Sequence, residues 1–259
     1  MRKRSSRLRP PALGAAVLLA LLLHSAPEYA RAGGFACADL DTVLAAHVHG
    51  EVVDYGALRA DPGPLRRFLA RTRDAEPDGW PPEAQIAFWV NVYNARVLDG
   101  VIRRPGLGSV LDPGKVLGVP TLAFFREKRV TAGEERSLDD IEHGILRGRF
   151  SEPRIHFVLN CASRSCPPLP PRALRGDSLE AALRAATAGF LTDTARNRVP
   201  PSGPLELSHV FKWFRGDFEK SAGSVQGFLV RHWPGEPPPD LATRRIRWLD
   251  YDWSLNGHW

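Results

Sequence analysis

Sulfur is scarce in this sequence, which has three cysteines and one methionine among 259 residues. No Cys-x-x-Cys pair is present, and His47 and His49 are the only closely spaced histidines. A structural zinc site is therefore not expected, and the sequence predicts no metal and no cofactor. Internal repeats and low-complexity linkers are also lacking, and the proline and glycine clusters are spaced like loops. This pattern favours one domain.

The chain also lacks a basic run after its first residues. Six of the 35 basic residues lie before Gly33, and the remainder of the chain holds 29 basic and 28 acidic residues. A nearly neutral domain lacks the excess positive charge that binds the phosphate backbone of a nucleic acid. The pI near 9.6 therefore reflects the N-terminal segment, and the sequence predicts no nucleic-acid partner.

Apart from one apolar run near its start, the chain also lacks long apolar runs. The apolar run at residues 15–23 is about half the ~20 residues that a bilayer span needs. It follows a basic start and precedes the small-residue exit Ala30-Arg31-Ala32, as in a secretory signal peptide. We therefore expect residues 1–32 to be removed. The mature protein is expected in the periplasm or outside the cell, without a transmembrane anchor.

The helix-start signals and the alternating segments of the chain predict an α+β fold in a single globular domain, residues 33–259. The longest helix is expected to begin near Pro82, and Ser137-Leu138-Asp139-Asp140 fits a capping box that opens a helix through Arg147. Residues 154–160 are predicted to form a buried strand and residues 244–251 a closing strand. Residues 121–130 are predicted to form either a strand pair or a strand with a turn at Ala132-Gly133. Long helices on a small, largely antiparallel sheet are compatible with a papain-like or transglutaminase-like architecture.

The end of the predicted 154–160 strand delivers Cys161 to a turn. Backbone N–H groups after a strand can stabilise both a thiolate and an oxyanion, so Cys161 is a candidate nucleophile. Its base would be His143, beside Glu142, or His156. Five positions separate His156 from Cys161, which places them on opposite faces of an ideal strand, so His143 is preferred.

A disulfide is the competing interpretation of the same cysteines. Exported thiols tend to be oxidised, so Cys161 and Cys166 can close a tight loop and leave an odd thiol. In that case His156 on a buried strand is a satisfied core residue.

Aromatic residues form a second constellation, with seven tryptophans in the chain. Indole rings line sugar and peptide grooves, but they also dominate hydrophobic cores, and core packing is favoured here. Asp139, Asp140 and Glu142 lie in the first turns of a predicted helix, where the helix dipole explains acidic residues without a glycosidase pair.

Five blocks of the sequence, in order, resemble one family. They are 88–95 (FWVNVYNA), 137–143 (SLDDIEH), 154–167 (RIHF with NCAS and CP), 213–218 (WF with DF) and 251–256 (YDWSLN). This set is similar to the family catalogued as domain of unknown function 547, over roughly residues 40–256. The resemblance implies no reaction and no cofactor. It does select polar positions: Asn91, Asn94, Glu142, His143, His156, Asn160, Cys161, Cys166, Asp217, Asp252 and Asn256. Because Cys37 lies outside the blocks, a Cys37–Cys166 bridge that spares Cys161 stays open.

Two functions remain as hypotheses. The first is a cysteine-dependent hydrolase or acyltransferase acting on amides or esters. In it Cys161 attacks, His143 takes the proton, Glu142 or Asn91 orients the imidazole, and N–H groups near Ala162 hold the oxyanion. The second is a non-catalytic envelope module that binds a small molecule, peptide or glycan. The candidate binding residues are Trp89, Asn94, His156 and Asn160.

The C-terminal residues 251–256 are expected to return to the fold. Two aromatic rings and a leucine in six residues are unlike a disordered tail. Tyr251, Trp253 and Leu255 alternate with polar residues, so one set can be buried. We expect this segment to pack against the helix that carries Trp89 and Asn91.

Overall fold

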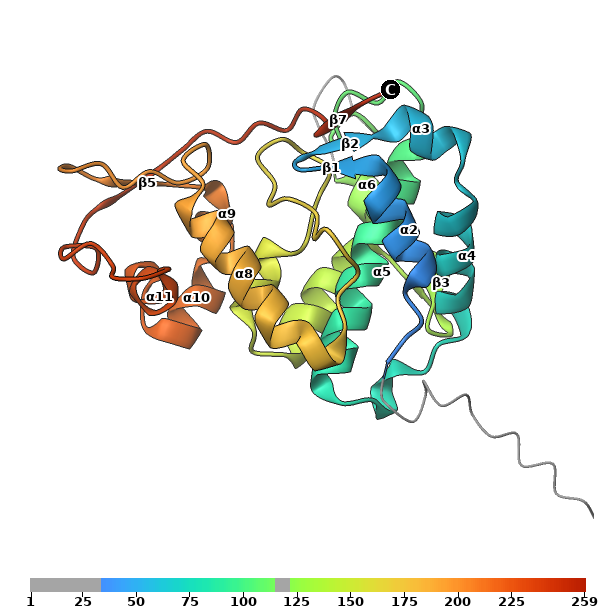
Figure 1. Ribbon diagram of the computed structural model, residues 1–259, viewed down its shortest axis with the longest axis horizontal. Helices are drawn as coiled ribbons and strands as arrows, with labels where there is room; N and C mark the ends of the chain where they lie inside the picture. The colour runs from blue at the N-terminus through green and yellow to red at the C-terminus, as the bar shows by residue number, and fades with distance from the viewer. Residues whose placement is uncertain (1–33, 115–121) are drawn as a thin grey trace, which may run out of the picture.

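Helix α5, Pro82–Ile102, is the central element of the fold. The computed structural model describes residues 34–114 and 122–259. Pro82 takes the first helical position, where its missing N–H breaks no hydrogen bond. Seventeen side chains of α5 are buried, so the helix is enclosed on nearly every side rather than along one stripe. Figure 1 shows the N-terminal helices α2 and α4 beside it.

The remaining helices are shorter and follow one another along the chain. The α-helices are α2 Ala38–His47, α3 Tyr55–Ala60, α4 Gly63–Arg71, α6 Ala123–Arg126, α7 Arg147–Arg149, α8 Leu179–Thr192, α9 His209–Trp213, α10 Arg215–Ala222 and α11 Val225–His232. A π-helix, η3, spans Asp140–Leu146, and 3-10 turns are η1 Thr72–Asp74, η2 Pro77–Gly79, η4 Pro153–Phe157 and η5 Gly176–Ser178. Among the described residues, no helix is both long and apolar enough to cross a membrane.

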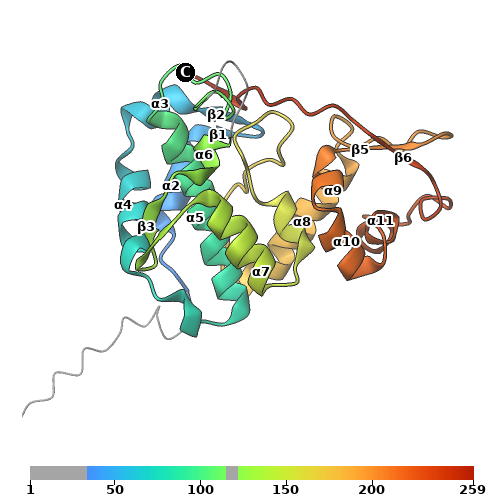
Figure 2. The same cartoon turned by 180° about the vertical axis from the view of Figure 1, so that it is seen from behind.

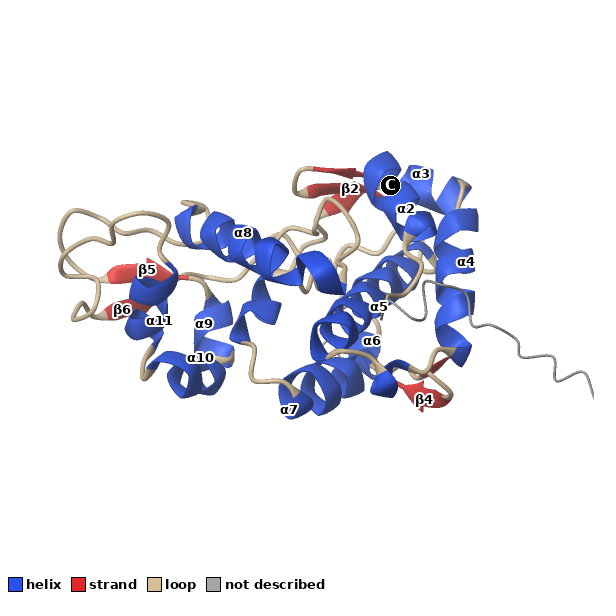
Figure 3. Cartoon of the chain, turned by 60° about the horizontal axis from the view of Figure 1, so that its bottom comes forward, coloured by secondary structure: helices blue, strands red, loops and turns tan. Residues whose placement is uncertain are grey.

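The strands form small separate sheets. They are β1 Val48–His49, β2 Val52–Asp54, β3 Arg129–Thr131, β4 Glu134–Arg136, β5 Leu205–Leu207, β6 Ile246–Trp248 and β7 Gly257–His258. β2 pairs antiparallel with β1 and parallel with β7, β3 pairs antiparallel with β4, and β5 pairs parallel with β6. The protein is therefore α+β, and within residues 34–114 and 122–259 its strands make three sheets of two or three strands each. Figure 3 shows two of them at opposite ends of the fold.

Large apolar side chains form two cores. The first surrounds α5, and the second is rich in phenylalanine and lies among α8, α9, α10 and α11. Ala186 of α8 packs against both cores. In Figures 1 and 2 the two groups of helices lie side by side, and the C-terminal segment crosses from β6 to β7 over the boundary.

The predicted strand at residues 154–160 is wrong. Residues Pro153–Phe157 form a 3-10 turn, in which the Glu152 carboxylate accepts the backbone N–H of Arg154 at 3.1 Å. Beyond the turn, the side chain of Asn94 takes the place of a neighbouring strand. It donates to the Val158 carbonyl at 2.8 Å and accepts from the Asn160 N–H at 2.9 Å.

Other sequence expectations meet mixed outcomes. The capping box is confirmed, because Ser137 Oγ accepts the Asp140 N–H at 3.0 Å and Asp140 accepts the Ser137 N–H at 2.8 Å. For residues 121–130 the strand pair is wrong, since Ala123–Arg126 is helical. The alternative is confirmed in part, because β3 is followed by a turn at Ala132-Gly133 and pairs with β4 beyond it. The closing strand is shorter than predicted, Ile246–Trp248. Thr121 and the predicted signal peptide lie outside the described residues.

Candidate functional site

The two cysteines of the 161–167 turn are joined in a disulfide. Cys161 is bonded to Cys166, with their Cα atoms 6.1 Å apart, and Cys37 is the free cysteine. The Cys37 thiol donates to the Phe35 carbonyl at 3.1 Å, and burial raises its pKa to about 11. The structure thus has the Cys161–Cys166 pairing rather than the Cys37–Cys166 pairing.

Backbone N–H groups beside Cys161 already have acceptors. The Ala162 N–H donates to Asn160 Oδ1 at 2.9 Å, and the Cys161 N–H donates to Cys166 Sγ at 2.8 Å. Ala162 adopts a left-handed conformation, with φ of 63°. The groups expected to hold an oxyanion therefore fix the turn in this state.

Two hydroxyl groups contact the half-buried Cys161 sulfur. Ser163 Oγ lies 3.0 Å from it and Tyr251 OH 3.3 Å, and the two hydroxyls are themselves 3.0 Å apart. Burial raises the pKa of Tyr251 to about 12, so its hydroxyl keeps its proton. Among the described residues, no hydrogen bond joins Cys161 to His143 or His156.

The π-helix η3 carries Glu142 and His143. π-Helices are rare in proteins, and those that occur are often located at functional sites. His143 is exposed, and its Nδ1 lies 3.0 Å from Arg147 Nη1, one turn along the helix. Glu142 forms a side-chain hydrogen bond with Tyr93 of α5; burial and this bond raise the pKa of Tyr93 well above its usual value.

His156 is held in an acid–base cluster between the two cores. Its Nε2 lies 2.8 Å from Asp217 of α10, and Arg147 donates to both oxygens of Asp217 at 2.6 and 3.0 Å. Phe214 stacks on the imidazole, with ring centroids 3.8 Å apart. Since Asp217 can only accept when ionised, His156 Nε2 carries the proton and the buried Nδ1 has no hydrogen-bond partner.

The environment of the cluster shifts both partners' pKa values downward. Burial lowers the pKa of His156, and the bond to Asp217 opposes this only in part. Burial opposes ionisation of Asp217, but the hydrogen bonds from His156 and Arg147 outweigh it and hold the pKa of Asp217 well below its usual value. The negative charge of Glu142 acts to raise the pKa of both His156 and Tyr251. The cluster and the Cys161 turn are thus electrostatic neighbours.

The side chains of the candidate asparagines bind mainly backbone groups, not the candidate catalytic side chains. Asn91 donates to the Leu174 carbonyl and accepts the Leu174 N–H, both at 2.8 Å. Asn160 donates to the Pro167 carbonyl at 2.8 Å and contacts Asn256 Nδ2 at 3.2 Å. Together with Asn94 they fix the irregular segments that follow the 3-10 turn. Among the described residues, no hydrogen bond connects Asn91 to His143.

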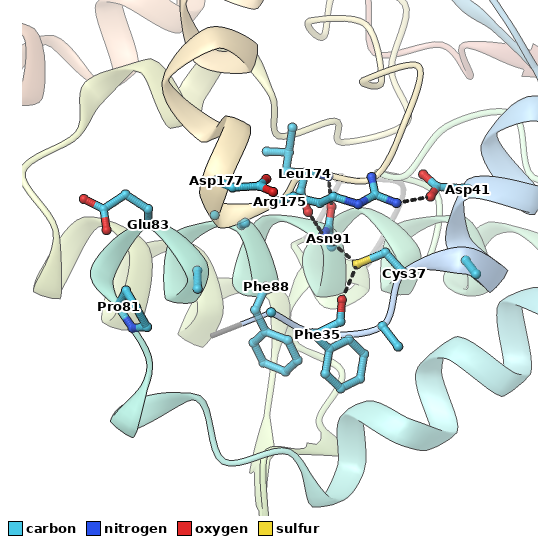
Figure 4. A pocket seen from close by; sticks show the side chains of 16 residues that line it. Phe35, Cys37, Asp41, Pro81, Glu83, Phe88, Asn91, Leu174, Arg175 and Asp177 are labelled. Carbon is cyan, nitrogen blue, oxygen red and sulfur yellow. Dashed lines mark hydrogen bonds and ion pairs between the residues drawn. The ribbon is translucent and has the colours of Figure 1, made fainter. Parts of the chain in front are cut away.

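A groove lies between α2, α5 and η5, away from the His156–Asp217 cluster. Its volume is about 880 Å³, and Figure 4 shows Cys37, Asn91 and the Asp41–Arg175 ion pair on its wall. Of the eight candidate residues, only Asn91 lines it. Trp89 is fully buried in the first core and faces Arg136, whose guanidinium lies 5.5 Å from the indole. Among the described residues, no group of three or more His, Cys, Asp or Glu side chains is placed for a metal ion.

Three aromatic rings gather beside the Cys161 turn, and we call them the aromatic triad: Trp213, Tyr251 and Trp253. Ring centroids are 4.6 Å apart for Trp213 and Tyr251, 4.7 Å for Tyr251 and Trp253, and 5.5 Å for Trp213 and Trp253. Trp213 is 45% exposed. The triad joins α9 of the second core to the C-terminal segment.

Comparisons with known proteins identify part of the chain. Residues 77–191 match the family described as "Protein of unknown function, DUF547". This match confirms the resemblance over those residues. The match runs from η2 into α8 and contains all eight candidate residues. No curated protein and no solved structure matched the chain.

Sequence reasoning missed several groups that the structure brings to the site. Arg147 was not selected, Trp213 and Asp217 were noted only as parts of a family block, and Tyr251 was predicted to pack but was given no role at the site. Arg147 lies four residues after His143, the spacing at which helical side chains meet, so that contact was available from the sequence. The Asp217 contact joins residues 61 positions apart and had no local signal.

Proposed function

We propose that this chain is an exported carbohydrate-binding module whose sugar ligand stacks on the aromatic triad. The observation that carries the proposal is the exposure of Trp213 within a group of three touching rings. Trp213 is 45% exposed, and with the partly buried Tyr251 and Trp253 rings it forms a contiguous apolar surface of the kind that marks binding sites. Sugar C–H faces are apolar and flat enough to pack on such rings.

Polar groups beside the triad supply what a sugar's hydroxyl groups need. Asp252 is exposed, and hydrogen bonds from the Ser254 side chain and backbone lower its pKa. Arg164 is exposed, and its charge acts on Asp252. A carboxylate and a guanidinium at the edge of an aromatic face can bind pairs of adjacent hydroxyls. The disulfide and the Asn160 bonds hold this edge rigid before a ligand arrives.

Binding by the triad can be tested with two tryptophan variants. The probes are the tetramer of N-acetylglucosamine in calorimetry and purified cell-wall glycan in pull-down. We expect Trp213→Ala to weaken binding about tenfold, equivalent to about 1.4 kcal/mol. Trp259→Ala is the matched control, because Trp259 is 40% exposed but packs on Tyr55 outside the triad. Absence of glycan binding by the native protein, or equal losses in the two variants, would contradict the proposal.

A cysteine-dependent hydrolase is the second candidate, and the hydroxyl contacts of Cys161 favour it. Ser163 and Tyr251 can donate to a thiolate at that position. The nucleophile would be free only after the disulfide is reduced, and the bonded N–H groups would have to be released. If this candidate is correct, hydrolysis of a p-nitrophenyl ester will begin after mild reduction and be lost in Cys161→Ala. Turnover that is independent of reduction, or retained in Cys161→Ala, would exclude it.

A further inference from the structure

We infer that the Cys161–Cys166 disulfide is a thiol-exchange site, at which a dithiol donor attacks the sulfur of Cys161. The two cysteine residues differ in exposure. Cys161 is half-buried, whereas Cys166 is 5% exposed. An incoming thiolate therefore reaches Cys161 first. The inference is independent of sugar binding, because it concerns the chemistry of the bond itself.

The exchange proceeds in two balanced steps. A thiolate of the donor attacks Cys161 Sγ, a mixed disulfide forms, the Cys161–Cys166 bond breaks and its electron pair leaves on Cys166 Sγ. The donor's second thiolate then attacks its own sulfur of the mixed disulfide and releases Cys161 as a thiolate. The protein gains two electrons as a dithiol, and the donor is oxidised to its disulfide.

Groups already in place stabilise both leaving thiolates. The Cys161 N–H points at Cys166 Sγ at 2.8 Å and can donate to the negative charge that develops there. The Ser163 and Tyr251 hydroxyls lie 3.0 and 3.3 Å from Cys161 Sγ and can donate to the second. A disulfide with purely structural duty needs neither set of donors.

The turn is also held by bonds that do not depend on the disulfide. Buried Arg196 donates to the Cys166 carbonyl at 3.0 Å and to the Arg164 carbonyl at 2.9 Å. Asn160 holds the Pro167 carbonyl and the Ala162 N–H. Opening the disulfide therefore leaves the two sulfurs close together, so that exchange is reversible without unfolding.

Two variants of the full chain, each lacking one cysteine of the disulfide, test the asymmetry. Cys166→Ser leaves the Cys161 thiol, and Cys161→Ser leaves the Cys166 thiol. Each is treated with oxidised glutathione under native conditions, and the adduct is followed by mass spectrometry. We expect Cys166→Ser to form the adduct at least ten times faster than Cys161→Ser. Cys37 is an internal control in both variants, since its burial and its raised pKa, about 11, slow its modification in the folded chain.

Equal rates, or faster modification of Cys161→Ser, with Cys37 unmodified would overturn the inference. If Cys37 is modified as well, circular dichroism shows whether the variants are still folded, and the native protein decides. It is incubated with reduced glutathione, quenched in acid, alkylated and cut with trypsin, which separates the cysteines at Arg164. Glutathione on peptide 155–164 with alkylated Cys166 on peptide 165–172 supports the inference. The reverse distribution, or a disulfide that opens only in denaturant, overturns it.

Discussion

At the scale of single residues, His156 couples the chemistry of the site to the stability of the fold. It lies between the two cores, is stacked under Phe214 and is bonded to Asp217. Its pKa in the folded protein is below the usual value, so the unfolded chain binds a proton at a higher pH than the folded protein does. The stabilising contribution is therefore complete above about pH 6.5 and is lost as the pH falls through the folded pKa.

We expect the free energy of unfolding to fall between pH 7 and 5, and His156→Gln to flatten this dependence. One proton contributes a slope of up to about 1.4 kcal/mol per pH unit. The pKa of Asp217 is lowered as well, so its contribution disappears only at more acidic pH, below its unfolded value near 4. Urea unfolding at a series of pH values measures the slope.

His232 provides the control for this prediction. Burial lowers its pKa too, so His232→Gln should remove only its own share and leave the His156 dependence in place. A slope in His156→Gln identical to that of the native protein would show that His156 does not titrate between the folded and unfolded states.

Two asparagines of α5 show which features of single residues can be predicted from the sequence and which cannot. The family resemblance selected Asn91 and Asn94 among its polar positions, and both are buried. It could not show that their amides bind backbone at Leu174 and Val158, because those contacts join residues 83 and 64 positions apart. Periodicity reports which way a side chain faces, while its distant partner depends on how intervening loops fold.

At the scale of elements, local signals predicted helices better than strands. The capping box at Ser137 and the proline at position 82 act within one turn of helix, and both were correct. Residues 154–160 alternate like a strand, but Pro153 opens a 3-10 turn and an asparagine side chain takes the ladder bonds. The π-helix was not predicted, because the apolar spacing of that segment also fits an α-helix.

The pairing of β2 with β7 requires glycine at position 257. A Cβ there would lie 2.1 Å from the Val53 carbonyl oxygen and 2.7 Å from the ring of Tyr55. We expect Gly257→Ala to lower the free energy of unfolding by about 3 kcal/mol, because neither backbone nor the buried ring can move away cheaply. Chemical denaturation measures the change.

Gly189→Ala is the matched control, with the opposite sign. Gly189 lies exposed within α8, and a Cβ there would meet nothing within 4 Å. Alanine should stabilise the helix by about 0.5–1 kcal/mol. Equal effects of the two substitutions would argue against the close approach of β7 to β2.

At the scale of the whole molecule, the C-terminal segment ties the two cores together. Tyr251 and Trp253 contact Trp213 of the second core, and Leu255 is buried in the first. The Asn256 N–H donates to the Ala162 carbonyl at 3.1 Å, and Asn256 Oδ1 accepts from Tyr55 at 2.7 Å. The sequence predicted that this segment returns to the fold. The hydrogen-bond partners in the structure are the Cys161 turn, Gly108 and Tyr55 with β2, rather than the long helix.

We expect deletion of residues 251–259 to abolish cooperative unfolding, since each buried large side chain contributes about 1.5–3 kcal/mol of a total near 5–15 kcal/mol. Thermal unfolding followed by circular dichroism is the measurement. Trp259→Ala, which removes one partly exposed ring, should keep a sharp transition at a modestly lower temperature. A soluble deletion variant with the native melting temperature would show that the segment is peripheral.

The asparagine bonds of α5 have a consequence for hydrogen exchange. The backbone N–H groups of Asn160 and Leu174 belong to irregular chain, which ordinarily exchanges within minutes or less. Here their acceptors are side chains of the most enclosed helix in the described fold, so these two protons are released only when α5 itself opens. Deuterium uptake should therefore place both amides in the slowest class, together with the core of α5, while exposed neighbours such as Arg172 exchange freely.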